Sequence, residues 1–361
     1  MHTVEVICNL NQKSYSYLEE NLPALSTPVE YIKRTNFYSQ KGIEQIELLT
    51  HVWTEKETQV ICKSYYLVLR CNPSIIMGDS KVLLLDMNKY TADEVIHGLF
   101  KRLYEIPEFC HIRLHKLHIS HFKVRRVDIA KDILVKDPKI IVWLSNMSFP
   151  YKHYNIERKP INKELDVLYR ESCYFTNRSR TFNLYNKLAD MMNKGKRIEP
   201  CELEQISKTV RLEIQIRKKG VSYLSTKLPT KRSLEPFLRK AFCDNYLEKE
   251  IKSLFHIEKY VSRSRAEEII NASNFKPRDK RVMLSIIDMI QNLKGLYELE
   301  KAIDDTTLFT PSVYGNLKSF RNRWLKKIRS LGIQPVVIPD SFGVDEIPSI
   351  YKLLTDKKGA I

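Results

Sequence analysis

Stretches of alternating or mainly apolar residues mark the first 220 positions of the chain. Runs rich in Val, Ile, Leu and Tyr predict strands at Val4–Cys8, Thr58–Cys71, Lys81–Leu85, Leu117–Val135, around 172–187 and around 209–217. One helical pattern interrupts them at 92–106, where Thr91 and Glu94 form a capping box. Strands and helices mixed without regular βαβ spacing favour an α+β domain with a mainly antiparallel sheet.

The pattern changes after Gly220. Turn-forming residues predict a linker at 221–233, and helical periodicity dominates beyond it. Four helices are expected there: 234–259, a short one capped by Ser264 and Glu267, 278–304 with a weak point at Gly295, and one from Thr310-Pro311 to just before Gly332. The sequence therefore predicts two domains, 1–230 and a smaller helical one at 231–361.

Charge points to a polyanionic partner. Lys and Arg outnumber Asp and Glu by 60 to 43, a net charge of +17, and each cation placed on a phosphate releases condensed counterions. A basic protein without a nucleic-acid partner is the alternative. Seven cysteines without CxxC spacing, no secretory signal and no 18-residue apolar run predict a cytoplasmic protein with reduced thiols and no membrane partner.

Two strand segments carry carboxylates on a polar face. In Arg126–Asp132, alternation places Arg126, Asp128 and Asp132 together, opposite Val127 and Ile129. In Val210–Arg217 the polar face holds Arg211, Glu213, Gln215 and Arg217. Carboxylate oxygens of this kind hold Mg²⁺ or Mn²⁺. The same alternation is also typical of the solvated side of a half-exposed sheet.

A third segment, Asn177–Lys187, combines arginines with a tyrosine. Alternation along this strand places Tyr185 and Lys187 on the face opposite Phe182, and Arg178 and Arg180 precede them. A strand tyrosine is far more often a packing residue than a nucleophile, so spacing alone does not decide its role.

The order of these segments resembles a known family. An R-V-D strand at 126–128, a basic segment ending in Tyr185 with Lys187 close behind, and V-R-L-E at 210–213 are similar to the replication initiators of filamentous phages, the gene II protein type, and to related plasmid and conjugative-element proteins. Staphylococcal-plasmid initiators look like more distant relatives. The resemblance covers roughly 115–220, with a weaker similarity over the N-terminal third.

The resemblance implies rolling-circle initiation by a nickase domain of HUH-like or ferredoxin-like type. Tyr185 would be the nucleophile that cleaves single-stranded DNA, and Asp128 and Glu213 would hold the divalent metal. Lys187 is expected to favour the phenolate or contact the phosphate. Expected DNA contacts come from Arg126, Arg178, Arg180 and Arg211. Single-stranded and duplex origin DNA and a host helicase and polymerase are the implied partners, and a homodimer stays open.

Some features depart from that family. Asp132 has no counterpart in the phage version, and its place as a further ligand rests on strand alternation. His118-Ile119-Ser120-His121 has one residue too many for the His-hydrophobic-His pair of other initiators. For these histidines, and for His111 and His115, sheet or DNA-contact roles are expected ahead of ligation.

The C-terminal helices are expected to bind DNA. In 311–331 an apolar stripe runs at helical spacing, and Lys318 and Arg321 lie off it, so the helix suits duplex DNA or is simply a solvated basic face. Three alternatives to a replication nickase stay open: a conjugative relaxase with the same chemistry, a non-enzymatic origin-binding initiator or repressor, and a tyrosine recombinase, which would work without a metal.

Overall fold

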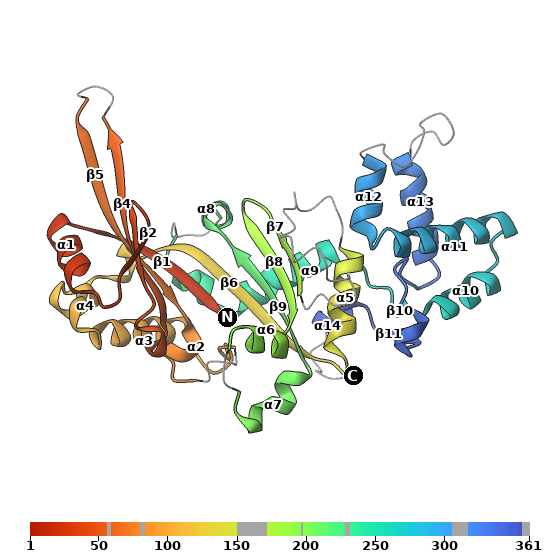
Figure 1. Cartoon of the computed structure of the whole chain (residues 1–361), viewed down its shortest axis with the longest axis horizontal. Coiled ribbons are helices and arrows are strands. Elements are labelled where there is room, and N and C mark those ends of the chain that lie inside the picture. Colours follow the sequence, from red (N-terminus) through yellow and green to blue (C-terminus); the bar gives the residue numbers. More distant parts are fainter. Residues whose placement is uncertain are drawn as a thin grey trace. The chain divides into compact units, whose positions relative to one another are not determined.

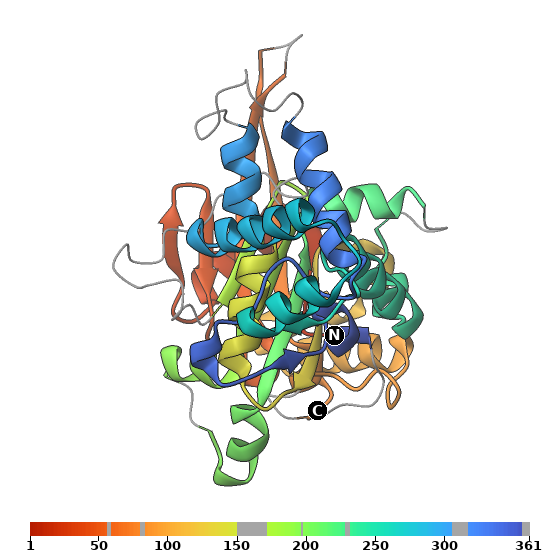
Figure 2. The same ribbon diagram turned by 90° about the vertical axis from the view of Figure 1, so that its right-hand side faces the viewer.

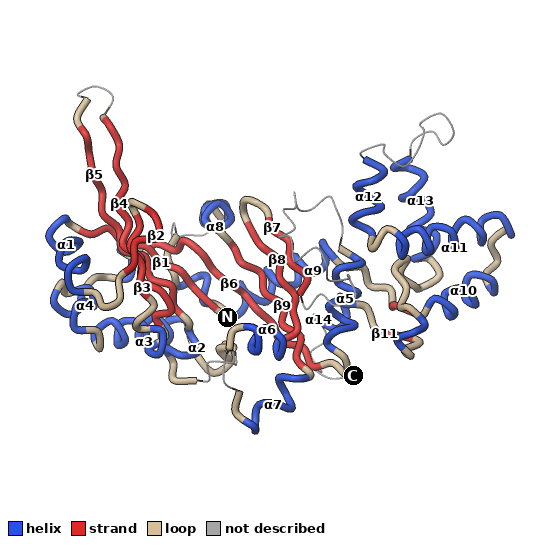
Figure 3. Tube along the Cα trace, viewed as in Figure 1, coloured by secondary structure: helices blue, strands red, loops and turns tan. Residues whose placement is uncertain are grey.

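A nine-stranded sheet dominates the structure (Figures 1 and 3). The computed structural model describes residues 1–55, 59–79, 84–149, 172–195, 198–227, 232–304 and 317–355. The strands are β1 (Thr3–Leu10), β2 (Ser26–Val29), β3 (Ile32–Thr35), β4 (Ile43–Thr54), β5 (Ile61–Cys71), β6 (Lys123–Leu134), β7 (Ser172–Thr176), β8 (Arg180–Asn186) and β9 (Thr209–Ile216). They are hydrogen-bonded in the order β2-β3-β4-β5-β1-β6-β9-β8-β7.

Every pair from β2 to β6 is antiparallel. The predicted α+β class with a large antiparallel sheet is therefore confirmed. The chain divides into two compact units: unit 1 comprises Met1–Lys131, Arg178–Thr181 and Glu213–Leu247, and unit 2 comprises Asp132–Asn177, Phe182–Leu212 and Glu248–Ile361.

In unit 1, helices cover one face of the sheet. The helices that lie wholly in this unit are α1 (Gln12–Asn21), α2 (Pro73–Ile76), α3 (Ala92–Tyr104), α4 (Pro107–His111) and α8 (Lys218–Ser225). Val4, Val6 and Leu67 are fully buried on the apolar face, and the Tyr15 ring of α1 packs on Tyr65 of β5. The capping box of α3 is present as predicted, with Thr91 and Glu94 each satisfying the other's backbone N–H.

Unit 2 has an aromatic core and a helical end. It holds α5 (Pro138–Ser148), α6 (Lys187–Asn193), α7 (Pro200–Ser207), α10 (Arg263–Ala272), α11 (Pro277–Asn292), α12 (Leu296–Asp304), α13 (Leu317–Arg329), α14 (Ile350–Thr355) and the short pair β10 (Tyr260–Val261) and β11 (Glu346–Ile347). Phe149 stacks on Phe175 with ring centroids 3.5 Å apart and also contacts Phe182 and Phe255. Helices α11, α12 and α13 pack against one another (Figure 2).

In the part of the chain that precedes the C-terminal helices, several predicted element boundaries were wrong. Leu117–Val135 opens with a 3₁₀ turn at Ile119–His121, so the strand starts only at Lys123. The expected linker is partly helical, because α8 continues to Ser225. Of the strand expected at Lys81–Leu85, residues 81–83 lie outside the described residues, and the last two residues form no strand.

The helical region is cut more finely than its periodicity suggested. The expected helix at 234–259 is a 3₁₀ turn (Glu235–Leu238) followed by α9 (Lys240–Leu254), which contributes residues to both units. Ser262 caps α10, whereas Ser264 bonds to Asp340. The start expected at 310–311 lies outside the described residues.

Gly295 does break the third predicted helix, between α11 and α12. Its φ of +129° is a backbone conformation that favours glycine, and a Cβ at this position would lie 3.0 Å from the Met147 carbonyl oxygen.

Candidate metal centre

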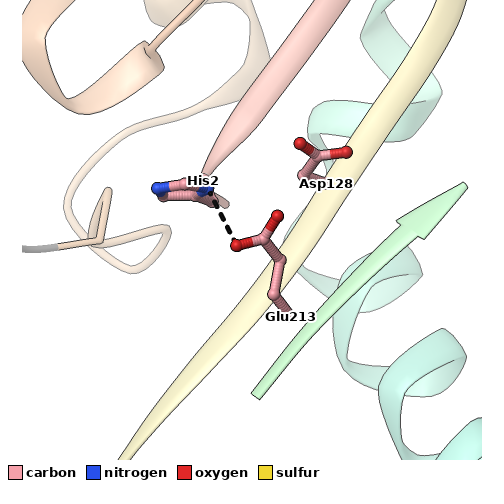
Figure 4. Close-up of side chains that lie close together, drawn as sticks. All are labelled: His2, Asp128 and Glu213. Atoms are coloured by element: carbon pink, nitrogen blue, oxygen red, sulfur yellow. Dashed lines mark ion pairs between the residues drawn. The ribbon is translucent and has the colours of Figure 1, made fainter. Parts of the chain in front are cut away.

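Three side chains from distant parts of the sequence converge in unit 1. His2 immediately precedes β1, Asp128 lies on β6 and Glu213 on β9, and one ligand atom of each lies within 4.8 Å of the other two (Figure 4). The antiparallel β1–β6 pairing brings His2 into place, because its backbone N–H donates to the Asp128 carbonyl oxygen at 3.0 Å. Strands β6 and β9 are neighbours in the sheet, and this brings Asp128 and Glu213 together.

A β-bulge shapes the strand next to this cluster. The β1–β6 register shifts between Glu5 and Val6, so that Arg126 pairs with Glu5 while Val124 pairs with Val6. The extra residue, Arg125, lets two successive arginines sit between two buried valines, Val124 and Val127. Bulges of this kind re-aim side chains and are frequent beside functional sites.

The electrostatics of Asp128 are dominated by burial. The carboxylate is 1% exposed, and Arg126 donates to both of its oxygens at 2.7 and 2.6 Å. Burial raises the pKa of Asp128 to about 7; Glu213 adds to the rise, while Arg126 and Arg70 oppose it. A second cation, in addition to Arg126, would stabilise the ionised form of this buried carboxylate.

The other two members of the cluster are held less tightly. His2 Nδ1 lies 3.4 Å from Glu213 Oε2. Gln215, on the same face of β9, donates to the other Glu213 oxygen at 2.9 Å. One imidazole nitrogen and two carboxylates suit Mn²⁺, and the carboxylates also suit Mg²⁺, so the donor set fits the expected cofactor class.

His2 was missed by sequence reasoning. Its only signal is its position directly before a strand that pairs with β6, and that pairing is invisible in the sequence. The four histidines between positions 111 and 121 lie elsewhere, in α4 and the turns after it. His111 stacks on Tyr17 with ring centroids 3.9 Å apart, and His118 bonds to Ser120.

Asp132 and Arg211 are paired with each other. Both nitrogens of the Arg211 fork, Nε and Nη2, donate to Asp132 at 2.6 Å, and the arginine is only 1% exposed. Arg211, which was expected to contact DNA, is thus a buried residue whose ion-pair partner is Asp132. Strand alternation placed Asp132 on the same face as Asp128, but its counter-ion is the buried guanidinium of Arg211, which also belongs to unit 2.

Tyr185 and Lys187 both belong to unit 2. Tyr185 is near the end of β8, and each side chain is 5% exposed. The strand does not continue to Lys187 as supposed. Asn186 instead caps α6 by accepting from the Leu188 and Ala189 amides, and Lys187 is the first residue of that helix.

The expected DNA contacts fall into different environments. Arg178 is exposed and Arg180 half-buried. Arg321 is 4% exposed and faces Glu300 at 3.6 Å, which corrects its expected position on an outer helix face. Lys318 lies in α13, but its side chain lies outside what is described. Among the α13 side chains that the structure describes, the exposed basic residues are Arg323 and Lys326.

Comparison with known families identifies the chain. The family model for the N-terminal part of the gene II replication-associated protein of phages matches residues 54–234, half of the chain. The chain belongs to this family and is a rolling-circle replication initiator of the filamentous-phage gene II kind. A search of curated proteins gave no significant match. Within the described residues, no helix is long and apolar enough to cross a membrane.

Proposed function

We propose that this initiator is a metal-dependent nickase and strand transferase acting on single-stranded origin DNA. The observation that carries the proposal is the convergence of His2, Asp128 and Glu213, two of which lie within the family match. A buried acidic centre with an imidazole has the donor chemistry of a divalent-metal site. The net charge of +17 supports a nucleic-acid substrate.

Tyr185 is the proposed nucleophile. Its phenolate oxygen attacks the scissile phosphorus, the bond from phosphorus to O3′ breaks, and the leaving oxygen takes up a proton. The products are a 5′-phosphotyrosine and a free 3′-OH, and the reverse reaction joins ends. A phenol with the ordinary pKa of about 10 is ionised in about one molecule in a thousand at pH 7, a deficit of roughly 4 kcal/mol.

A bound metal ion and the cationic side chains near the nucleophile are proposed to support this reaction. A bound Mg²⁺ or Mn²⁺ at the His2–Asp128–Glu213 centre would supply Lewis-acid stabilisation of the developing charge. Lys187, at the first turn of α6, is proposed to favour the Tyr185 phenolate or to contact the phosphate. Arg178, which is exposed in the segment before β8, and Arg180 are both proposed to bind the phosphates of the DNA backbone.

Nicking of single-stranded origin DNA tests the proposal. With Mn²⁺ we expect a covalent protein–DNA adduct that EDTA prevents and that Tyr185→Phe does not form. Asp128→Ala and Glu213→Ala should abolish cleavage and leave oligonucleotide binding largely intact. Ser264→Ala changes an exposed residue of unit 2; this variant is the control and should cleave normally. Binding without cleavage under every metal would favour a non-enzymatic initiator, and chelator-resistant cleavage would favour a recombinase-like mechanism.

The proposed partners follow from the same role. A conjugative relaxase would share this chemistry, and the DNA sequence that is cleaved distinguishes the two roles. Duplex origin DNA is proposed to meet the exposed basic residues of unit 2, where Arg323 and Lys326 of α13 adjoin the start of α11 through the Lys327–Asp279 ion pair. A host polymerase would extend the 3′-OH, and a host helicase would separate the strands ahead of it.

A further inference from the structure

One face of the unit 1 sheet carries a series of charged and polar side chains outward from the metal centre. Along β4, Glu47, His51 and Trp53 share this face, and the register places Glu47 opposite Arg34 of β3. Across β1, Glu5 pairs with Arg70 of β5 on one side and with Arg126 of β6 on the other. The face therefore continues over five adjacent strands up to Asp128.

Three arginines on this face rest on two buried glutamates. Arg34 binds Glu47 at 2.6 Å, Arg70 binds Glu5 at 3.1 Å, and Arg125, re-aimed by the bulge, lies 3.4 Å from Glu5 and 3.6 Å from Glu47. The glutamate side chains are 7–8% exposed, whereas the arginines are 31–38% exposed. A ligand approaching this face therefore meets guanidinium groups whose orientation the carboxylates fix.

A guanidinium has five N–H donors, and an ion pair with one carboxylate uses at most two of them. The remaining N–H groups on a half-exposed arginine can bind a phosphate. The buried glutamates reduce the net charge, but they also remove the entropy loss of ordering the arginine side chains when a ligand binds.

The same face carries exposed aromatic rings at its far end. Strands β4 and β5 run beyond their neighbours as a two-stranded arm (Figures 1 and 3), since β3 pairs only as far as Leu49 and β1 only from Tyr65. On the arm His51 and Trp53 stack with ring centroids 5.4 Å apart, and Trp53 is 41% exposed. A two-stranded ribbon is marginally stable alone, and its large apolar side chains would normally be covered.

We propose that this face is a binding path for single-stranded DNA, in which Arg34, Arg70 and Arg125 hold phosphates and His51 and Trp53 stack on unpaired bases. Oriented cations combined with aromatic platforms are the means by which proteins bind single strands without reading sequence. The inference rests on the proposed function, because it leads the strand toward the Asp128 centre. It adds the residues that hold the substrate outside that centre.

Intrinsic fluorescence tests the stacking directly. The chain has three tryptophans, and Trp143 and Trp324 are buried, so Trp53 is the exposed one. Oligo(dT) added in EDTA, where no cleavage occurs, should quench wild-type fluorescence. Trp53→Ala should lose that quenching and bind labelled oligo(dT) roughly five- to a hundredfold more weakly by anisotropy. Val52→Ala, the neighbour on the opposite face of the arm, is the matched control and should bind like wild type.

Salt dependence tests the arginines. Arg34→Gln should lower the slope of log Kd against log salt by about 0.7, as expected for one lost contact with a single strand. Lys63→Gln removes an exposed cation from the opposite face and should leave the slope unchanged. Arg70→Lys keeps the charge and provides a folded variant, with circular dichroism confirming the fold; it should keep the slope but bind more weakly.

The proposal is overturned if Trp53→Ala binds as tightly as Val52→Ala, or if Arg34→Gln keeps the wild-type slope. The proposal is also overturned if Trp53→Ala loses as much affinity for duplex as for single-stranded oligonucleotides, because bases in a duplex cannot stack on Trp53. All these measurements are made without metal or cleavage. They can therefore fail while the nickase chemistry holds, and succeed even if Tyr185 is not the nucleophile.

Discussion

Replacing Asp128 by Asn should change how the stability of the metal-free protein depends on pH. Asp128 is buried, and burial raises its pKa from the ordinary 3.8 to about 7. Between these values the folded protein holds a proton that the unfolded chain releases. Folding is therefore disfavoured progressively as pH rises from about 4 to 7, the reverse of the usual behaviour of a salt-bridged carboxylate.

The size of the effect follows from the gap between the two pKa values. At 1.36 kcal/mol per pH unit, a rise from 3.8 to about 7 corresponds to roughly 4 kcal/mol. The amide of the Asp128→Asn variant cannot titrate, and Arg126 stays charged throughout, so the lost Arg126 bonds shift the variant by an amount independent of pH. From pH 4 to pH 8 the wild type should lose about 4 kcal/mol of stability relative to Asp128→Asn.

Urea unfolding in EDTA at intervals from pH 3 to pH 8 measures this difference. At pH 8, Mn²⁺ at a hundred times its Kd should return about 2.7 kcal/mol to the wild type and nothing to the variant. A difference that stays flat refutes the argument that burial governs Asp128. A wild type that gains relative stability as pH rises from 3 to 5 would show instead that Arg126 depresses the pKa.

Three further changes test separate parts of the structure. Asp132→Asn should cost about 3–5 kcal/mol, because it leaves the buried Arg211 guanidinium without its bidentate partner; Mn²⁺ affinity measured by calorimetry should not change, and weaker Mn²⁺ binding in a fully stable variant would make Asp132 a ligand after all. Phe149→Ala should lower the free energy of unfolding by about 3–5 kcal/mol through loss of the stack on Phe175, and a loss below about 1 kcal/mol would contradict the central place of that ring in unit 2. His2→Ala should weaken Mn²⁺ binding at least about tenfold, whereas an unchanged Kd would remove His2 from the site.

Local signals in the sequence predicted the elements that depend on neighbouring residues. The Thr91–Glu94 capping box and the break at Gly295 are examples, since each depends on a few successive positions. Alternation likewise placed Asp128 and Glu213 on polar strand faces, and the structure brings them together.

Features that depend on strand pairing escaped prediction. His2 reaches the centre only through the β1–β6 pairing, and the bulge at Arg125 has no signature in its own strand. Asp132 shows the limit of alternation, because a face assignment does not identify the counter-ion, here Arg211. The C-terminal helix illustrates the same limit: Arg321 looked exposed by periodicity but is buried against Glu300.

The site of the covalent adduct tests the central claim most directly. Single-stranded origin DNA cleaved with Mn²⁺ would be trimmed with nuclease, and the protein digested with trypsin for mass spectrometry. The account predicts the nucleotide mass on the peptide Thr181–Lys187, whose one tyrosine is Tyr185. Nucleotide mass on the peptide Glu171–Arg178, which carries Tyr174, or on any other peptide would contradict it.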